Sequence, residues 1–271
     1  MEGLSMSDPR PQPLPDEFIE PLARAADRLG PFARQILWYP EVTSTNDLAA
    51  AMAERGAREG SVVVANGQSA GRGRQGRSWA SPAGAGLYVS TVLRPLECAL
   101  PLLTIAAGVG VADGIRIATG LVPDLKWPND VFVSGRKAAG VLAEATSSAA
   151  GTCVVLGFGI NVSPALYPPD VAARATSLER ELGRAVDRGL LLAECLCSLA
   201  ERYQDLTSGR RDAVVEAWRG RAAATAGRRV QWNEAGAARE GVADTIDDTG
   251  ALVVRTNAGL ARVMSGEVRW G

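Results

Sequence analysis

The stretch that decides the fold class is Gly71-Arg72-Gly73-Arg74-Gln75-Gly76-Arg77, followed by Ser78-Trp79-Ala80-Ser81-Pro82-Ala83-Gly84. Its glycines have the G-x-G-x-x-G spacing of a dinucleotide-binding turn, which needs a strand before it and a helix after it. An apolar strand at residues 61–65 does precede the glycines, but residues 78–84 cannot begin a long helix. A second β-rich segment follows at 86–94. No βαβ unit forms, and the pattern disfavours a Rossmann fold.

The same stretch carries three arginines, Arg72, Arg74 and Arg77. A guanidinium binds carboxylate and phosphate oxygens in a two-pronged geometry that lysine cannot copy. We interpret residues 71–77 as an anion clamp. The alternative, which the pattern alone leaves open, is a mobile basic surface loop.

The composition of the chain limits the partners and the types of catalysis that it can support. The chain has 271 residues, enough for one medium and one small domain, and a formal net charge of −1. A general attraction to nucleic acid or to an anionic membrane is therefore not supported. The chain has no histidine, which removes Ser-His-Asp and Cys-His catalysis and most zinc chemistry.

The four cysteines lack metal-ligand spacing, and Cys195 and Cys197 fall in an apolar helix where we expect them to be buried. We find no signal peptide and no apolar run of membrane-spanning length. These features predict a reduced, cytoplasmic protein without membrane contact.

Periodicity and turn residues predict the order of elements. Residues 1–14 are expected to be a disordered leader and residues 163–182 a mobile loop. From residue 225, short strands separated by turns indicate a small β-barrel of about 45 residues. Ser44, Thr45 or Asn46 is expected to cap the helix at 47–55. One further predicted helix ends near residue 30, and three others cover 100–119, 186–206 and 211–219. The other predicted strands cover 35–42, 125–127, 130–133, 137–144 and 152–160.

Three further segments bear chemistry. In Leu125-Lys126-Trp127-Pro128-Asn129-Asp130, a lysine at a sheet edge precedes residues able to cap, turn or hold Mg²⁺. Residues 136–144 contain Gly140 within a strand, and Gly157-Phe158-Gly159-Ile160-Asn161-Val162 ends an apolar strand. A strand glycine marks the close approach of a ligand or a second backbone. The alternatives are a β-turn, an ordinary hairpin and a β-bulge, respectively.

Taken in this order, the segments closely resemble those of the biotin protein ligases, over about residues 38–270. The resemblance implies an α+β catalytic domain at 15–222, with helices on a mixed, mostly antiparallel sheet like that of class II aminoacyl-tRNA synthetases. It also implies an SH3-like β-barrel at 225–271. A winged helix, which some members carry, needs more than the 34 residues before the first strand, so we expect no nucleic-acid binding.

The resemblance implies that the protein forms biotinyl-5′-adenylate from biotin, ATP and Mg²⁺, and then transfers biotin to a lysine of a biotin carboxyl carrier domain of an acyl-CoA carboxylase. It also allows a homodimer. The alternatives are a lipoate or octanoate ligase of related fold, and a biotin-binding module without turnover.

Residue by residue, the resemblance implies catalytic roles for Lys126, Arg72 and Arg74. It implies biotin contacts by Ser44, Thr45, Asn46, Gln68, Arg72, Gly73, Arg74, Lys126 and Gly140. It implies ATP contacts by Arg72, Arg74, Arg77, Asn129, Asp130 and Asn161, and no metal site made by the protein itself.

Burial of the biotin rings needs an apolar wall, for which Trp79, Leu142 and Ile160 are candidates. The adenylate is hydrolysed by water, so residues 67–81 and 163–177 are expected to become ordered over it. No tryptophan occurs between Val162 and Ala217, which leaves a stacking partner for adenine unassigned.

Overall fold

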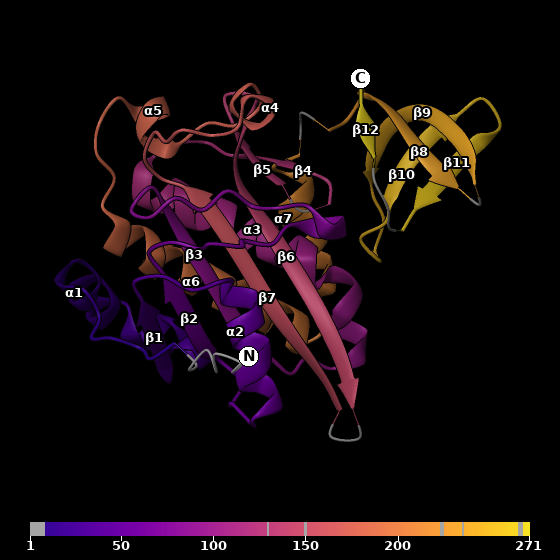
Figure 1. Ribbon diagram of the computed structural model, residues 1–271. Helices are drawn as coiled ribbons and strands as arrows, with labels where there is room; N and C mark the ends of the chain where they lie inside the picture. The colour runs from indigo at the N-terminus through magenta and orange to yellow at the C-terminus, as the bar shows by residue number, and fades with distance from the viewer. Residues whose placement is uncertain (1–8, 129, 149–150, 223–224, 235, 265–267) are drawn as a thin grey trace, which may run out of the picture.

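The computed structural model describes residues 9–128, 130–148, 151–222, 225–234, 236–264 and 268–271. Two sheets organise it: a seven-stranded sheet in the larger part of the chain and a five-stranded sheet at the C-terminal end (Figure 1). The larger sheet has the order β1-β2-β3-β7-β6-β5-β4. Its strands are β1 Gln35–Tyr39, β2 Ser61–Ala65, β3 Gly86–Leu93, β4 Asp124–Lys126, β5 Asp130–Val133, β6 Arg136–Ser148 and β7 Gly151–Asn161.

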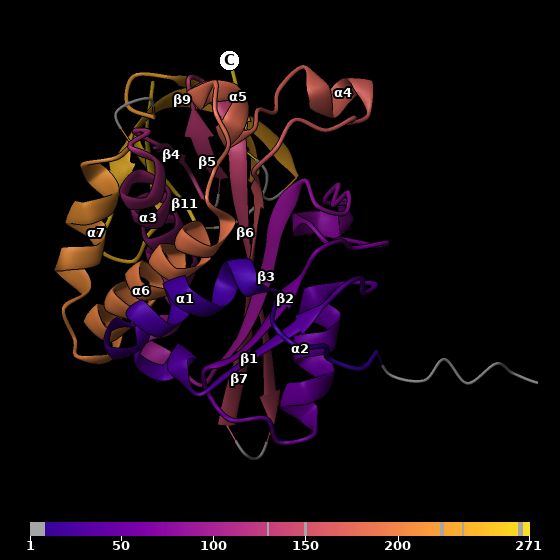
Figure 2. The ribbon, with the colours of Figure 1, turned by 90° about the vertical axis from the view of Figure 1, so that its left-hand side faces the viewer.

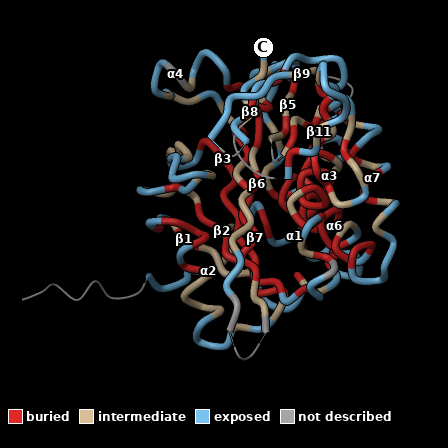
Figure 3. The backbone as a smooth tube through the Cα atoms, turned by 90° about the vertical axis from the view of Figure 1, so that its right-hand side faces the viewer, coloured by how far each residue is buried: buried red, intermediate tan, exposed pale blue. Residues whose placement is uncertain are grey.

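Only β1 and β2 pair in parallel, and every other neighbouring pair in this sheet is antiparallel. The expectation of a mixed, mostly antiparallel sheet is confirmed. The valine-rich run of β2 is buried throughout its length, as expected for a strand covered on both faces. Figure 3 shows buried backbone in β2 and β3 as well as in the helices beside them.

Helices cover both faces of the sheet (Figure 2). α1, α3, α6 and α7 lie on one face, and α2 packs on the other against β2, β3 and β7. The helices are α1 Asp16–Arg24, α2 Thr45–Glu54, α3 Leu100–Thr119, α4 Pro169–Ala172, α5 Leu178–Leu182, α6 Arg188–Thr207 and α7 Arg211–Arg219.

The centre of the core is the contact between α3 and α6. A Cβ at Gly114 would lie 2.5 Å from the Cα of Cys195, and one at Gly110 would lie 2.9 Å from the Cα of Leu199. The two backbones therefore approach as closely as glycine permits. Cys195 and Cys197 are buried in α6, which confirms their expected role as small apolar residues.

α3 corrects one expectation. Within the described chain it is the helix that is long and apolar enough to cross a membrane, whereas the sequence predicts no such run. Most of it is buried against α6 and the sheet, which is the position of a core helix.

The C-terminal sheet is antiparallel and has the order β11-β10-β9-β8-β12. It is tied to the larger sheet at β4: the Thr225 hydroxyl donates to the carbonyl of Leu125 (3.0 Å), and the Trp127 indole N–H donates to the carbonyl of Gly250 (2.9 Å). These bonds bring the end of the chain beside Lys126. Its strands are β8 Arg229–Glu234, β9 Ala237–Ile246, β10 Leu252–Thr256, β11 Gly259–Val263 and β12 Arg269–Trp270.

Several local expectations differ from the structure. The predicted mobile loop at 163–182 contains α4 and α5, whose few residues are too short to show helical periodicity. β12 was not predicted, since two residues carry no periodic signal. Within the predicted leader, Gln12 forms a β-bridge with Trp38. The bulge expected as one alternative in β7 is absent, because its register with β3 and β6 is continuous.

The α3–α6 contact gives a stability prediction. Gly114→Ala places a methyl group 2.5 Å from the Cys195 backbone, so the helices must separate, and we expect a loss of about 1–3 kcal/mol in the free energy of unfolding. Gly108→Ala, in the same helix, is the matched control because its new methyl group would lie 3.7 Å from the nearest atom, in Leu125. There we expect a gain of up to about 1 kcal/mol from helix propensity. Urea denaturation measures both, and equal effects would contradict the close contact.

Candidate functional site

A cavity of about 580 Å³ lies over β6 and β7, between residues 71–77 and the C-terminal sheet. Of the described residues predicted for the site, Asn161 and Ile160 do not line it. The lining residues predicted from the sequence are Ser44, Thr45, Asn46, Gln68, Arg72, Gly73, Arg74, Arg77, Lys126, Asp130 and Gly140. Trp79 and Leu142 also line it, whereas Ile160 is fully buried in the core. Asn129 lies outside the described residues.

The N-terminus of α2 forms one end of the cavity. Ser44 is the cap, and its hydroxyl accepts from the N–H of Asp47, as the sequence predicted. The backbone N–H and hydroxyl of Thr45 donate to Gln68 Oε1 at 2.8 and 3.1 Å. Gln68 Nε2 in turn donates to the hydroxyl of Ser81 (2.7 Å). This end therefore has polar side chains held in fixed orientations, with donors and acceptors that suit a small neutral polar group.

Glycines of β6 and β7 form the floor. A Cβ at Gly157 would lie 2.0 Å from Asn46 Oδ1, one at Gly159 would lie 2.4 Å from Trp79 Nε1, and one at Gly140 would lie 3.2 Å from the Trp79 ring. The indole therefore lies directly against the sheet. Its N–H is buried and has no hydrogen-bond partner among the residues that the structure describes, an arrangement that costs free energy in a folded protein.

Residues 71–77 form a short hairpin over this floor. The Trp79 N–H donates to the Gly71 carbonyl (2.8 Å) and the Gly73 N–H to the Arg77 carbonyl (2.7 Å). At its tip Gln75 and Gly76 have φ of 57° and 71°, the left-handed region that a tight turn requires. The hairpin thereby presents its arginines at separate points of the rim.

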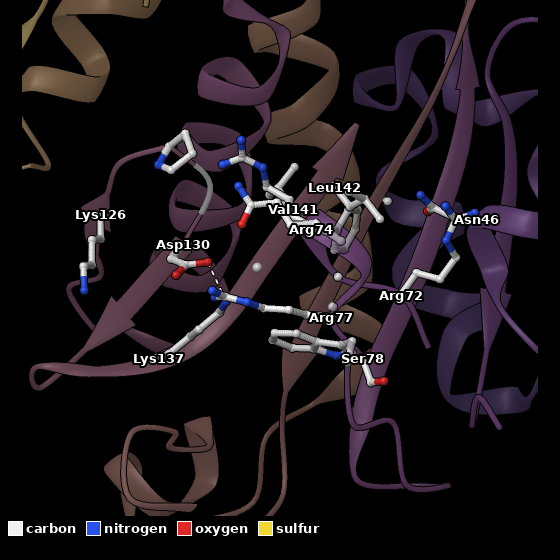
Figure 4. A pocket seen from close by; sticks show the side chains of 18 of the residues that line it. Asn46, Arg72, Arg74, Arg77, Ser78, Lys126, Asp130, Lys137, Val141 and Leu142 are labelled. Atoms are coloured by element: carbon white, nitrogen blue, oxygen red, sulfur yellow. Dashed lines mark ion pairs between the residues drawn. The ribbon is translucent and has the colours of Figure 1, made fainter. Parts of the chain in front are cut away.

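The three arginines have different surroundings. Arg72 is paired with the carboxylates of Asp47 and Glu144, each at 2.5 Å. Arg74 is half-buried, and burial lowers the pKa of its guanidinium, while the nearby carboxylate of Asp130 acts in the opposite direction. In Figure 4, Arg77 points toward Asp130 and Lys137, whereas Arg72 lies beside Asn46.

Both lysines of the chain, Lys126 and Lys137, line the cavity. Lys137 Nζ lies 2.5 Å from Asp130 Oδ1 and 5.2 Å from the centre of the Trp79 ring. Lys126 Nζ lies 5.2 Å from the ring of Phe132 and 5.1 Å from that of Trp270, so it belongs to the end of the cavity nearest the C-terminal sheet. Burial lowers the pKa of Lys126, and the positive charges of Arg228, Lys137 and Arg174 lower it further.

Sequence reasoning missed Arg174, Arg269 and Trp270, which also line the cavity. Arg174 is placed by a parallel bridge between Lys137 and Ala175. Residues 174–176 have no motif of their own, so no local signal indicated this pairing. Asn161 supports the same segment, since its Nδ2 donates to the carbonyl of Thr176 (3.0 Å).

The charge of the cavity is strongly positive. Of the described residues that line it, Asp130 is the only carboxylate, and its partner is Lys137. In the described part of the chain no three His, Cys, Asp or Glu side chains lie close enough together to hold a metal ion. Such a cavity attracts polyanions and screens two anions brought close to each other. The cations are Arg72, Arg74, Arg77, Lys126, Lys137, Arg174 and Arg269.

Comparison with known proteins agrees with this geometry. Residues 38–161 match the model of the biotin/lipoate A/B protein ligase family, and residues 225–269 match that of the biotin protein ligase C-terminal domain. The bifunctional ligase/repressor BirA of Bacillus subtilis is 33% identical over 244 residues, which cover 88% of this chain and 74% of that protein. The biotin–[acetyl-CoA-carboxylase] ligase of Mycobacterium tuberculosis is 36% identical over 244 residues, covering 87% of this chain and 88% of that protein.

Among solved structures, the biotin protein ligase of Aquifex aeolicus in complex with biotin and ATP has a TM-score of 0.77 and 28% sequence identity. The match covers 88% of this chain and 99% of that one. The sequence matches, the fold and the cation-lined cavity over a glycine floor lead to one assignment: the chain belongs to the biotin protein ligase family.

Proposed function

We propose that this protein is an ATP-dependent biotin–[biotin carboxyl carrier protein] ligase. It forms biotinyl-5′-adenylate from biotin and MgATP, and then transfers biotin to a lysine of the carrier domain of an acyl-CoA carboxylase. The observation that carries the proposal is the cavity itself, which combines a polar end, a flat glycine floor and a rim of cations. The neutral polar head of biotin suits the polar end, and its apolar ring and chain suit the floor. The two anions, the biotin carboxylate and the ATP phosphate, suit the rim of cations.

We place the head group of biotin at the N-terminus of α2. Ser44, Thr45, Asn46 and Gln68 offer hydroxyl and amide groups of fixed orientation there. The apolar rings and chain would then lie over Gly140 and beside Trp79 and Leu142. This placement brings the biotin carboxylate toward Lys137, next to Arg74 and Arg77.

The two lysines have different proposed roles. Lys137 lies beside Trp79 and Asp130, and there we place the meeting of the carboxylate and the α-phosphate. Lys126 lies farther along, between Phe132 and Trp270, which suits the nucleotide. We therefore give Lys137 the central role that the sequence had suggested for Lys126.

In the first step, a carboxylate oxygen of biotin attacks the α-phosphorus of ATP, and pyrophosphate leaves with its Mg²⁺. In the second, the amine of the carrier lysine attacks the acyl carbon of the adenylate and AMP leaves. The repulsion between carboxylate and phosphate opposes the first step. Preorganised cations lower that barrier because they need no reorientation as charge shifts. Mg²⁺ arrives with the triphosphate as part of the substrate.

Two alternatives are less favoured. A lipoate or octanoate ligase shares the family model over residues 38–161, but the match over 225–269 is to a domain named for biotin protein ligases. A binding module without turnover would have no need for the cations at the adenylation centre. We further propose a cytoplasmic location, and we leave the homodimer as a proposal.

Mass spectrometry tests the function directly. A purified carrier domain incubated with this protein, biotin and MgATP should gain the mass of one biotin on one lysine. Because the enzyme has only two lysines, both in the cavity, self-labelling is readily mapped and separated from carrier modification. Lipoate in place of biotin is the control. Labelling with lipoate alone, or with neither acid, would contradict the proposal.

The lysine assignment has its own test. Lys137→Ala should lower the rate constant of adenylate formation by about 10²–10³-fold, the scale found when one preorganised electrostatic group is removed. Lys126→Ala should mainly raise the KM for MgATP. Pyrophosphate release under saturating and limiting ATP separates the two effects. The reverse pattern would return the central role to Lys126.

A further inference from the structure

Arg72 has surroundings that set it apart from the other two arginines of its hairpin. Its Nη1 lies 2.5 Å from Asp47 Oδ1 and its Nη2 lies 2.5 Å from Glu144 Oε1. Asp47 is in the first turn of α2 and Glu144 is on β6. One guanidinium thus joins three segments that are far apart in the sequence.

This pairing makes Arg72 a poor anion ligand. Both terminal nitrogens already have a carboxylate partner, and the group of three carries a formal net charge of −1. An incoming carboxylate or phosphate would be repelled by Asp47 and Glu144 at nearly the distance at which it was attracted by Arg72. The hydrogen bond to Asp47 is the main cause that raises the pKa of Arg72, so the guanidinium keeps its positive charge.

Glu144 connects this ion pair to the polar end of the cavity. Its Oε2 accepts from Asn46 Nδ2 (2.9 Å), and Asn46 Oδ1 accepts from the Ser90 hydroxyl (2.6 Å). The same carboxylate therefore fixes both Arg72 and an amide at the floor of the cavity. A shift of the hairpin would therefore disturb the position of Asn46 through Glu144.

We propose that Arg72 is a positioning residue: its ion pairs with Asp47 and Glu144 anchor the 71–77 hairpin to α2 and β6, and so aim Arg74 and Arg77 into the cavity. Arg72 itself does not bind the anions of biotin or ATP. This replaces the role expected for it from the sequence. The kinetic consequence rests on the proposed function, whereas the structural consequence does not.

The structural test uses ligand-free protein and trypsin. Asp47→Asn removes one anchoring charge and leaves every arginine of the hairpin available for cleavage. We expect the rate of cleavage within residues 71–77 to rise roughly fivefold, as for the loss of a partly exposed ion pair. NaCl at about 1 M should accelerate cleavage of the unmodified protein in the same way, because the pair is accessible to screening. Unchanged cleavage in the variant would overturn the proposal.

Glu54→Gln is the matched control. Glu54 is an exposed carboxylate near the other end of α2, so this variant has the same change in net charge without touching Arg72. It should cleave like the unmodified protein. If Glu54→Gln accelerates cleavage as much as Asp47→Asn, the effect is one of net charge and the anchor is refuted.

The kinetic test separates positioning from anion binding. Asp47→Asn should raise the KM for biotin severalfold and leave kcat within about twofold, since the groups at the reacting atoms remain. Arg72→Gln should act in the same direction, and the double variant should be no worse than Arg72→Gln alone, because both changes break one interaction. Arg72→Lys should restore part of the effect. A kcat loss of about 100-fold in Arg72→Gln, with Asp47→Asn unaffected, would make Arg72 an anion ligand after all.

The two readouts also separate this proposal from the assignment of function. If the unmodified protein formed no biotinyl-adenylate, the ligase proposal would fail, and the trypsin comparison would still decide whether Asp47 anchors the hairpin.

Discussion

The site depends on three glycines that face the cavity from two neighbouring strands of the sheet. Gly157 and Gly159 of β7, and Gly140 beside them on β6, leave room for Asn46 and Trp79 to lie directly on the backbone. Any larger residue at Gly157 or Gly159 would occupy the space that those side chains fill. The sheet stays regular there, with continuous register between β6 and β7, so a flat floor is obtained without a bulge. Asn46 and Trp79, which lie on these glycines, line the cavity together with the cations.

Those cations come from separate segments because no single element can reach all sides of the floor. The hairpin at 71–77 covers one side, and the last residue of β4 is Lys126. The bridge between Lys137 and Ala175 brings in Arg174, and β12 adds Arg269. Burial lowers the pKa of Lys126, and repulsion from the neighbouring positive charges lowers it further, while Asp130 acts in the opposite direction. The binding of anions in a cavity of this kind is therefore electrostatically favourable.

The sequence revealed the parts of this site that are local. The arginine hairpin, Lys126, Gly140 and the cap at Ser44 each lie in a short motif whose chemistry can be understood from neighbouring residues. Parts that depend on long-range pairing could not be predicted. Arg174 reaches the cavity through a two-residue bridge to Lys137, and Asn161 supports that segment from the neighbouring strand. The mixed, mostly antiparallel character of the sheet was expected only from the resemblance, because strand pairing is not encoded in local periodicity.

Arg72 shows that the type and spacing of residues in a motif do not determine the role of each residue. Three arginines at spacings of two and three residues suggest three equivalent anion ligands, yet a guanidinium takes its role from the charges around it. Asp47 precedes Arg72 by 25 residues and Glu144 follows it by 72, so neither carboxylate is visible in the motif. An arginine held by two fixed carboxylates gives the hairpin a defined position, while Arg74 and Arg77 face a cavity in which Asp130 already has a lysine partner. The division explains why one hairpin needs three arginines: holding the hairpin in place and holding a ligand's anions demand opposite electrostatic surroundings, and one guanidinium cannot have both.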